Sequence, residues 1–152
     1  MDKGSTILVG FSTDKQDWIS AVIRWATWWR HSHVVLIAPT ADHFIESTHG
    51  KGVVGGHLAE FMDRDGRELR CIPHPDPQAV WDKAAGQIGK PYDWRYMLGW
   101  AFGRDWSDPA AWSCSELIAW AADLFPLDFA GRITPRDIYM LSKPLPLERI
   151  AP

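Results

Sequence analysis

The sequence WSCSELIAW at positions 112–120 places a cysteine at the expected start of a helix. Ser113 followed three residues later by Glu116 is a capping box, in which the serine hydroxyl accepts the N3 backbone N–H and the glutamate reaches back to the cap residue. Cys114 is then the first helical residue, where unpaired N–H groups and the helix dipole favour a thiolate over a thiol. This pattern indicates nucleophilic chemistry. The alternative is that Cys114 is a small apolar side chain filling the core.

A thiolate nucleophile needs a base that holds its proton and a third group that orients the base. His33 begins a β-rich run at 33–38, and a second such run follows a turn at 43–48. A tight hairpin would place His33 opposite Thr48 and Glu46 diagonally across from His33 on the same face. A one-residue slip in register would turn Glu46 to the other face. The alternatives are a solvated position for Glu46 and a strand-edge histidine without a catalytic role.

The helix after Cys114 has apolar residues at helical spacing, so one stripe can be buried while its N-terminus stays accessible. These residues are Leu117, Ile118, Ala121, Leu124 and Phe125. The other elements expected from pattern and turn chemistry are a strand at 7–11, a helix at 17–30, strands at 53–58 and 69–73, a helix at 77–88 capped by Asp76 and ended by Gly89, and a short helix from Thr134 to about Leu141.

Two aromatic-rich segments stand apart from these elements. In the helix at 17–30, apolar residues including Trp18, Trp25 and Trp29 cover more than one face. Burial in the core is the expected explanation, and a ligand, partner or membrane surface is the alternative. The segment 89–111 is loop-like and rich in Trp and Tyr, which is typical of a functional loop or of a segment packed over a site.

Composition narrows the classes of function. A chain of 152 residues fits one domain spanning 1–152. Its 16 basic and 19 acidic side chains, net −3, give no electrostatic reason to expect nucleic acid as a partner. The two cysteines, Cys71 and Cys114, do not form a C-x-x-C pair, so a disulfide framework is not expected, although one bridge between them stays open.

The N-terminal sequence has neither the pattern of a signal peptide nor a run long enough to span a membrane. We therefore expect a cytoplasmic location and no integral membrane segment. Export of a phage or effector protein without such a segment remains an alternative. The sequence leaves the oligomeric state open.

The order of the motifs resembles a known family. His33, Glu46, Gly-Lys-Pro-Tyr-Asp at 89–93, Ser-Cys-Ser-Glu-Leu at 113–117 and Ile-Thr-Pro-Arg-Asp-Ile at 133–138 follow one another as in the circularly permuted branch of the NlpC/P60 papain-like superfamily. This branch is the YaeF/YiiX-like group, with lecithin retinol acyltransferases as more distant relatives. The resemblance covers about residues 7 to 142. The histidine precedes the cysteine here, as permutation requires.

The resemblance implies an α+β, papain-like fold in which an antiparallel sheet packs against the cysteine-bearing helix. It implies Cys114 as nucleophile, His33 as general base, Glu46 as the third member, and Tyr92 as a donor to the oxyanion beside the Cys114 N–H. Tyr92 is otherwise one more aromatic of a packed shell. No metal or organic cofactor is required.

The implied reaction is acyl transfer through a thioester, on an amide bond of a peptide or peptidoglycan fragment. Relatives also act on lipid acyl chains, so lipid acyl hydrolysis or transfer is the alternative. A binding module that lacks catalysis on the same fold is a further alternative.

Other polar residues offer weaker candidates. His31 takes the place of His33 if the strand starts earlier. His49 and His57, with a cysteine, could be imagined as zinc ligands, but no H-x-x-x-H or C-x-x-C pair supports that site.

Overall fold

The protein is described by a computed structural model, which covers residues 5–13, 18–27, 29–95, 99, 108, 110–126 and 133–145. Most of the aromatic segment predicted at 89–111, including 96–98 and 100–107, lies outside these residues. The start of the helix predicted at 17–30 also lies outside them.

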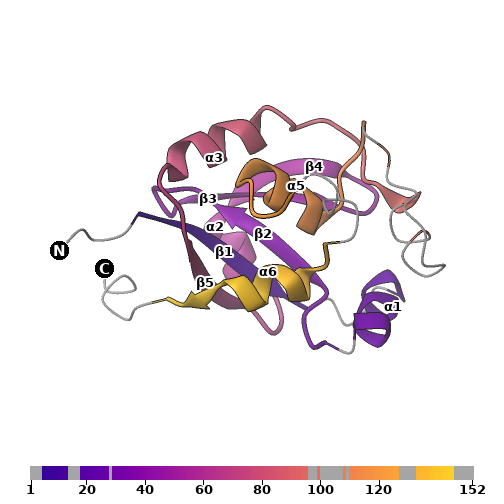
Figure 1. Cartoon of the computed structure of the whole chain (residues 1–152). Coiled ribbons are helices and arrows are strands. Elements are labelled where there is room, and N and C mark those ends of the chain that lie inside the picture. Colours follow the sequence, from indigo (N-terminus) through magenta and orange to yellow (C-terminus); the bar gives the residue numbers. More distant parts are fainter. Residues whose placement is uncertain are drawn as a thin grey trace.

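The described part of the chain is an α+β structure built on a six-stranded antiparallel sheet with the order β4-β3-β2-β1-β5-β6 (Figure 1). The strands are β1 (Thr6–Ser12), β2 (His33–Ile37), β3 (His43–Thr48), β4 (Gly52–His57), β5 (Glu68–Pro73) and β6 (Lys143–Pro144). The helices of the described residues are α1 (Trp18–Thr27), α2 (Leu58–Met62), α3 (Pro77–Ala85), α5 (Cys114–Ala121) and α6 (Pro135–Leu141). The antiparallel sheet and the helix beginning at Cys114 were both predicted.

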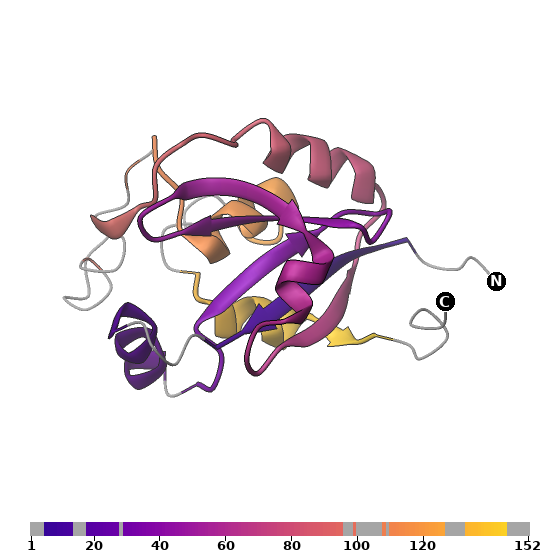
Figure 2. The same ribbon diagram turned by 180° about the vertical axis from the view of Figure 1, so that it is seen from behind.

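Helices cover both faces of the sheet because successive strand residues point to opposite sides. On one face, Val34 and Leu36 of β2 pack in the larger core cluster with Leu117 of α5. On the other face, Val35 and Ile37 pack in a second cluster around α2. Figure 2, seen from behind, shows α2 in front of the sheet, with α3, α5 and α6 on its far side.

The hairpin of β2 and β3 has the predicted register. Leu36 pairs with Ile45 and Ile37 with Phe44. Continuing this antiparallel register places His33 opposite Thr48, as the turn chemistry predicted. The core-facing pattern of both strands holds the register, since a one-residue slip would turn every apolar side chain to the wrong face.

The start of α5 is the predicted capping box. The Ser113 hydroxyl accepts the backbone N–H of Glu116 at 3.2 Å, and a Glu116 carboxylate oxygen accepts the N–H of Ser113 at 3.1 Å. Cys114 is the first helical residue, but it is only 5% exposed, so this helix start is more enclosed than predicted. The helix ends at Ala121. Leu124 and Phe125, which were also expected in its apolar stripe, follow the helix and pack against the same core.

Two expectations about helices need correction, and two short elements were not predicted. Trp18 and Trp25 of α1 are 71% and 78% exposed, so the core explanation is wrong for these two side chains. The helix after Asp76 ends at Ala85 rather than near Ile88, where turns take over before Gly89. Neither α2 nor β6 was predicted, because elements of five and two residues carry too little periodicity to be recognised.

Candidate active site

His33 and Glu46 meet across the β2–β3 hairpin. His33 Nε2 lies 2.6 Å from Glu46 Oε2, a contact between two side chains that are both largely buried. This is the diagonal pair that the hairpin register predicts. Because Glu46 occupies Nε2, the ring nitrogen left for another partner is Nδ1.

Cys114 lies close enough to His33 to act on its charge, since helix α5, which begins with Cys114, packs against β2 and β3. Burial alone would lower the pKa of His33, but the neighbouring Cys114 side chain and the Glu46 carboxylate raise it to about 10. The structure therefore brings together the three side chains predicted to act, and His33 is held as an imidazolium at neutral pH.

Arg64 is a fourth member that the sequence did not reveal. Its Nη1 donates to Glu46 Oε2 at 2.6 Å and its Nη2 to Oε1 at 2.7 Å, a bidentate pair. The guanidinium also lies over the rings of Phe44 and Phe61, 5.1 and 5.5 Å from their centroids. Burial alone would raise the pKa of Glu46, but its bonds to Arg64 and His33 lower it to about 2. Glu46 is thus ionised and fixed in position.

The segment just before Cys114 is anchored at Trp112. The Trp112 carbonyl accepts the Ser47 hydroxyl of β3 at 2.5 Å and the Asp93 N–H at 3.1 Å, while its own N–H donates to the Pro91 carbonyl at 3.1 Å. The predicted Gly-Lys-Pro-Tyr-Asp motif therefore fastens the cysteine-bearing segment to the sheet. This explains its place in the site without giving each of its residues a chemical role.

Gly52 lets that motif approach the sheet closely. It has φ of +74°, and a Cβ on it would lie 2.2 Å from the Lys90 carbonyl oxygen. The same oxygen accepts the Val53 N–H at 2.9 Å, and the Gly89 N–H donates to the Val53 carbonyl at 3.0 Å. A side chain at position 52 would push the motif, and with it the Cys114 segment, away from β4.

Tyr92 lies next to this segment through its backbone, in a bridge with Trp112. Its ring packs edge-on against His49, with centroids 6.0 Å apart. The Cys114 N–H stands in the first turn of α5, where backbone N–H groups have no acceptor within the helix. The role of Tyr92 as an oxyanion donor remains a prediction.

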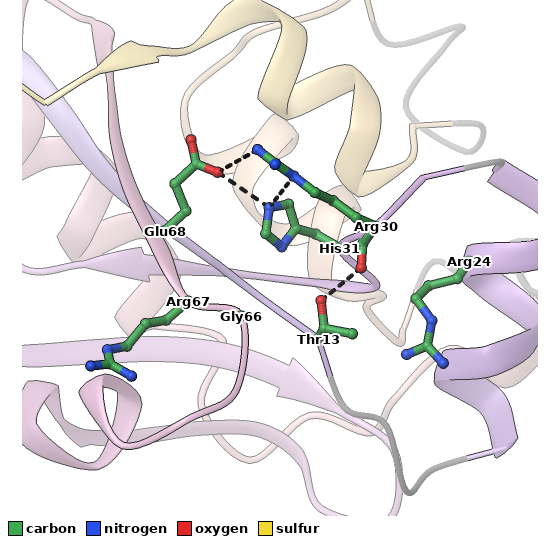
Figure 3. Close-up of a pocket in the computed structure, with 7 residues that line it drawn as sticks. All are labelled: Thr13, Arg24, Arg30, His31, Gly66, Arg67 and Glu68. Carbon is green, nitrogen blue, oxygen red and sulfur yellow. Dashed lines mark hydrogen bonds and ion pairs between the residues drawn. The ribbon is translucent and has the colours of Figure 1, made fainter.

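His31 belongs to a different cluster. The strand begins at His33, and His31 Nε2 instead lies 3.1 Å from Arg30 Nε and 3.3 Å from Glu68 Oε2 (Figure 3). Arg70 Nη1 and the Tyr139 hydroxyl both donate to Glu68 Oε1 at 3.0 Å. Burial is the main cause that lowers the pKa of His31, assisted by the charges of Arg30 and Arg70.

The remaining candidates do not join the site. Both cysteines are free thiols, and the Cys71 thiol lies 3.9 Å from the Pro144 carbonyl oxygen. His57 stacks on His43 with centroids 4.6 Å apart. Among the described residues, no group of three or more His, Cys, Asp and Glu side chains is arranged to hold a metal ion. No helix in the same residues has the length and apolar character needed to cross a bilayer.

Comparison with known proteins found no match: no protein-family model matches the chain, and no curated protein matches its sequence.

Proposed function

We propose that this chain is a cysteine hydrolase that works by acyl transfer through a thioester, with an amide bond of a peptide or peptidoglycan fragment as its substrate. One observation carries the proposal: His33 lies 2.6 Å from the Glu46 carboxylate, which Arg64 holds in place, and Cys114 lies close enough to help raise the pKa of His33 to about 10. The motif order that resembles the permuted NlpC/P60 superfamily points to the same chemistry and to a papain-like topology.

The reaction begins with Cys114 as a thiolate and His33 as an imidazolium. The thiolate sulfur attacks the carbonyl carbon, and the carbonyl oxygen takes the negative charge, facing the Cys114 N–H and, in the prediction, the Tyr92 hydroxyl. His33 gives its proton to the leaving amine as the C–N bond breaks, which leaves a thioester. His33 then removes a proton from water, the hydroxide attacks the thioester, and the acid leaves as the thiolate is restored.

Glu46 and Arg64 act on this sequence through His33. Glu46 holds the ring orientation and stabilises the imidazolium, as a carboxylate does in a nucleophile–histidine–acid triad. Arg64 keeps the carboxylate ionised and aimed at Nε2. They are positioning residues, since neither is placed to touch the substrate.

Lipid acyl hydrolysis or transfer is the second candidate, and the exposed Trp18 and Trp25 of α1 favour it. Tryptophan side chains at a surface suit an amphipathic substrate or the interface of a lipid layer. The same thioester chemistry would then act on an ester carbonyl.

Alkylation of Cys114 by iodoacetamide, followed by mass spectrometry across pH in a Cys71→Ala background, tests the proposal. We expect rapid alkylation of Cys114 at neutral pH, and a fall in rate of about a hundredfold in His33→Ala, since a positioned acid–base partner is worth about that much. His31→Ala is the matched control and should alkylate like the parent. Equal rates in the parent and in His33→Ala would refute the catalytic pair.

Turnover of peptide amides and of acyl esters then separates the substrate classes. Cys114→Ala should abolish turnover of whichever class the parent cleaves. An activated Cys114 with cleavage of esters alone would replace the amide proposal with the lipid candidate. A chain that binds these ligands equally in parent and Cys114→Ala forms, without turnover, would be a binding module.

A further inference from the structure

Helix α1 presents an apolar stripe to solvent. Trp18, Val22 and Trp25 are 71%, 40% and 78% exposed, and their spacing of four and three residues puts them on one face of the helix. Ser20, on another side of α1, is buried, and its hydroxyl is hydrogen-bonded to that of Ser32. The helix is therefore attached to the body of the protein on one side and carries two exposed indoles on another.

A basic pocket lies next to α1, on the side of the helix that carries Ser20: Arg24, one of its lining residues, donates to the Ser20 hydroxyl at 3.0 Å. Its volume is about 640 Å³, and its lining includes the guanidinium groups of Arg24, Arg30 and Arg67 together with the Thr13 side chain. Figure 3 shows Arg24 coming from α1 and Arg67 from the turn that precedes β5. Glu68 is the one carboxylate among the lining residues. The pocket is thus locally positive although the whole chain has a net charge of −3.

We propose that α1 and this pocket dock the protein onto an anionic membrane surface. Trp18, Val22 and Trp25 enter the boundary between headgroups and acyl chains, where tryptophan is favoured. Arg24 and Arg67 bind the phosphate groups of anionic lipids, for which the planar guanidinium is suited, while Arg30 is paired with Glu68 at 2.9 Å. Apolar side chains flanked by basic ones are the combination that holds an interfacial helix on such a surface.

The dimensions of α1 fit this orientation. Its 10 residues span about 15 Å, half of the roughly 30 Å hydrocarbon core, so the helix lies on the bilayer surface instead of crossing it. Binding energy comes from apolar area buried in the lipid together with attraction to its negative charge. A protein partner with an acidic rim would meet the same charges, but the paired indoles on a single short helix favour the lipid interface.

Docking through α1 would place the candidate active site beside the membrane. The bond between Ser20 and Ser32 ties α1 to the residue just before His33. Both views show α1 at the end of the sheet where β2 begins (Figures 1 and 2). The docking itself does not depend on the chemistry of Cys114, so the two proposals can fail separately.

Co-sedimentation with lipid vesicles tests the docking, using the full chain with Cys114→Ala so that no lipid can be turned over. We expect binding to vesicles that contain phosphatidylglycerol, and far weaker binding to vesicles of phosphatidylcholine alone. Replacing both indoles, Trp18→Ser with Trp25→Ser, should reduce the partition coefficient by about tenfold or more, since burial of a large apolar side chain is worth at least that factor. Ile88→Ser is the matched control, because Ile88 is 52% exposed beyond α3, and it should bind like the parent.

The basic pocket is tested by Arg24→Gln combined with Arg67→Gln. This variant should bind more weakly and show a shallower dependence on salt, because fewer phosphate contacts remain to be screened. Thermal unfolding of each variant checks that the fold is retained. Absence of parent binding to anionic vesicles would overturn the proposal, as would parent-like binding of the double tryptophan variant. If only the arginine changes weakened binding, the pocket would be an anion site and α1 would not be a docking helix.

Discussion

Two histidines separated by one residue each lie against a glutamate that binds an arginine, yet only one of the two rings is cationic at neutral pH. His33 lies against Glu46, and the pKa of His33 is raised to about 10. His31 lies against Glu68, and the pKa of His31 is lowered below its usual 6.5. Burial is the largest influence on both rings and lowers the pKa of both. The side chains around each ring therefore decide whether its pKa is raised or lowered.

The position of the arginine relative to the ring is one difference between the two pairs. Arg64 donates to both oxygens of Glu46, including the Oε2 that faces His33 Nε2, so it holds the carboxylate to which Nε2 donates. Arg30 instead donates to His31 Nε2 itself, and a ring nitrogen that accepts from Arg30 has no hydrogen for Glu68. The other difference is Cys114, which lies beside His33 and raises its pKa, whereas Cys114 has no such influence on His31. A carboxylate neighbour by itself does not make a histidine cationic.

Neutralising each glutamate in turn should give the largest contrast. Glu46→Gln removes the charge that supports the His33 imidazolium, so we expect Cys114 alkylation and any turnover to fall by about a hundredfold. Glu68→Gln, a change of the same size in the other pair, should leave alkylation unchanged. Rates are measured with iodoacetamide in a Cys71→Ala background. Equal losses in the two variants would mean that the two pairs do not differ in the way we describe.

Removing each arginine should give a smaller contrast, seen mainly in stability. Arg64→Met leaves the buried Glu46 carboxylate without its bidentate partner, and we expect a loss of about 3 kcal/mol in the free energy of unfolding. Alkylation should also slow, because the carboxylate is no longer held toward His33. Arg30→Met removes a largely exposed pair with Glu68 and should cost no more than about 1 kcal/mol.

Urea denaturation measures both losses, and Arg64→Lys separates charge from geometry. Lysine restores the positive charge but cannot make the bidentate pair of hydrogen bonds, so it should recover part of the stability and less of the alkylation rate. If Arg64→Met were as stable as Arg30→Met, Glu46 would be held by other groups.

The site is predictable from sequence where local chemistry decides the arrangement. Alternating apolar residues on both sides of a tight turn set the hairpin register, and the register alone places Glu46 beside His33. Likewise, Ser113 and Glu116 lie close in sequence, so the capping box that puts Cys114 at the start of α5 could be recognised directly.

The rest depends on packing between distant segments. Arg64 follows a five-residue helix that no periodicity reveals, and it reaches Glu46 only because Phe61 anchors that helix on the sheet. For α1, apolar residues around the helix do not tell which side meets the core. Burial was the natural expectation for Trp18 and Trp25, but their side chains stand in solvent.

The smallest effect, and the most direct comparison of the two histidines, is the dependence of stability on pH. Above about pH 8.5 the unfolded chain has lost the protons of both His33 and Cys114, whereas the proposed thiolate–imidazolium pair keeps one on His33, so stability should fall as the pH rises toward about 10. Below pH 6.5 the unfolded chain takes up a proton that His31 in the folded protein resists, so stability should fall as the pH drops. Each proton of difference between the folded and unfolded states contributes a slope of at most about 1.4 kcal/mol per pH unit.

Stability should therefore be highest between about pH 6.5 and 8.5 and should fall on either side, with His33 contributing to the alkaline limb and His31 to the acid limb. Urea denaturation at a series of pH values is expected to show a flatter alkaline limb in His33→Gln and a flatter acid limb in His31→Gln. Below about pH 4.5 the acid limb steepens in every variant, because Glu46 and Glu68 both have lowered pKa values and must take up protons as the pH falls. A His33→Gln variant that kept the parent's alkaline limb would show that His33 is not cationic in the folded protein, and the thiolate–imidazolium pair would lose its basis.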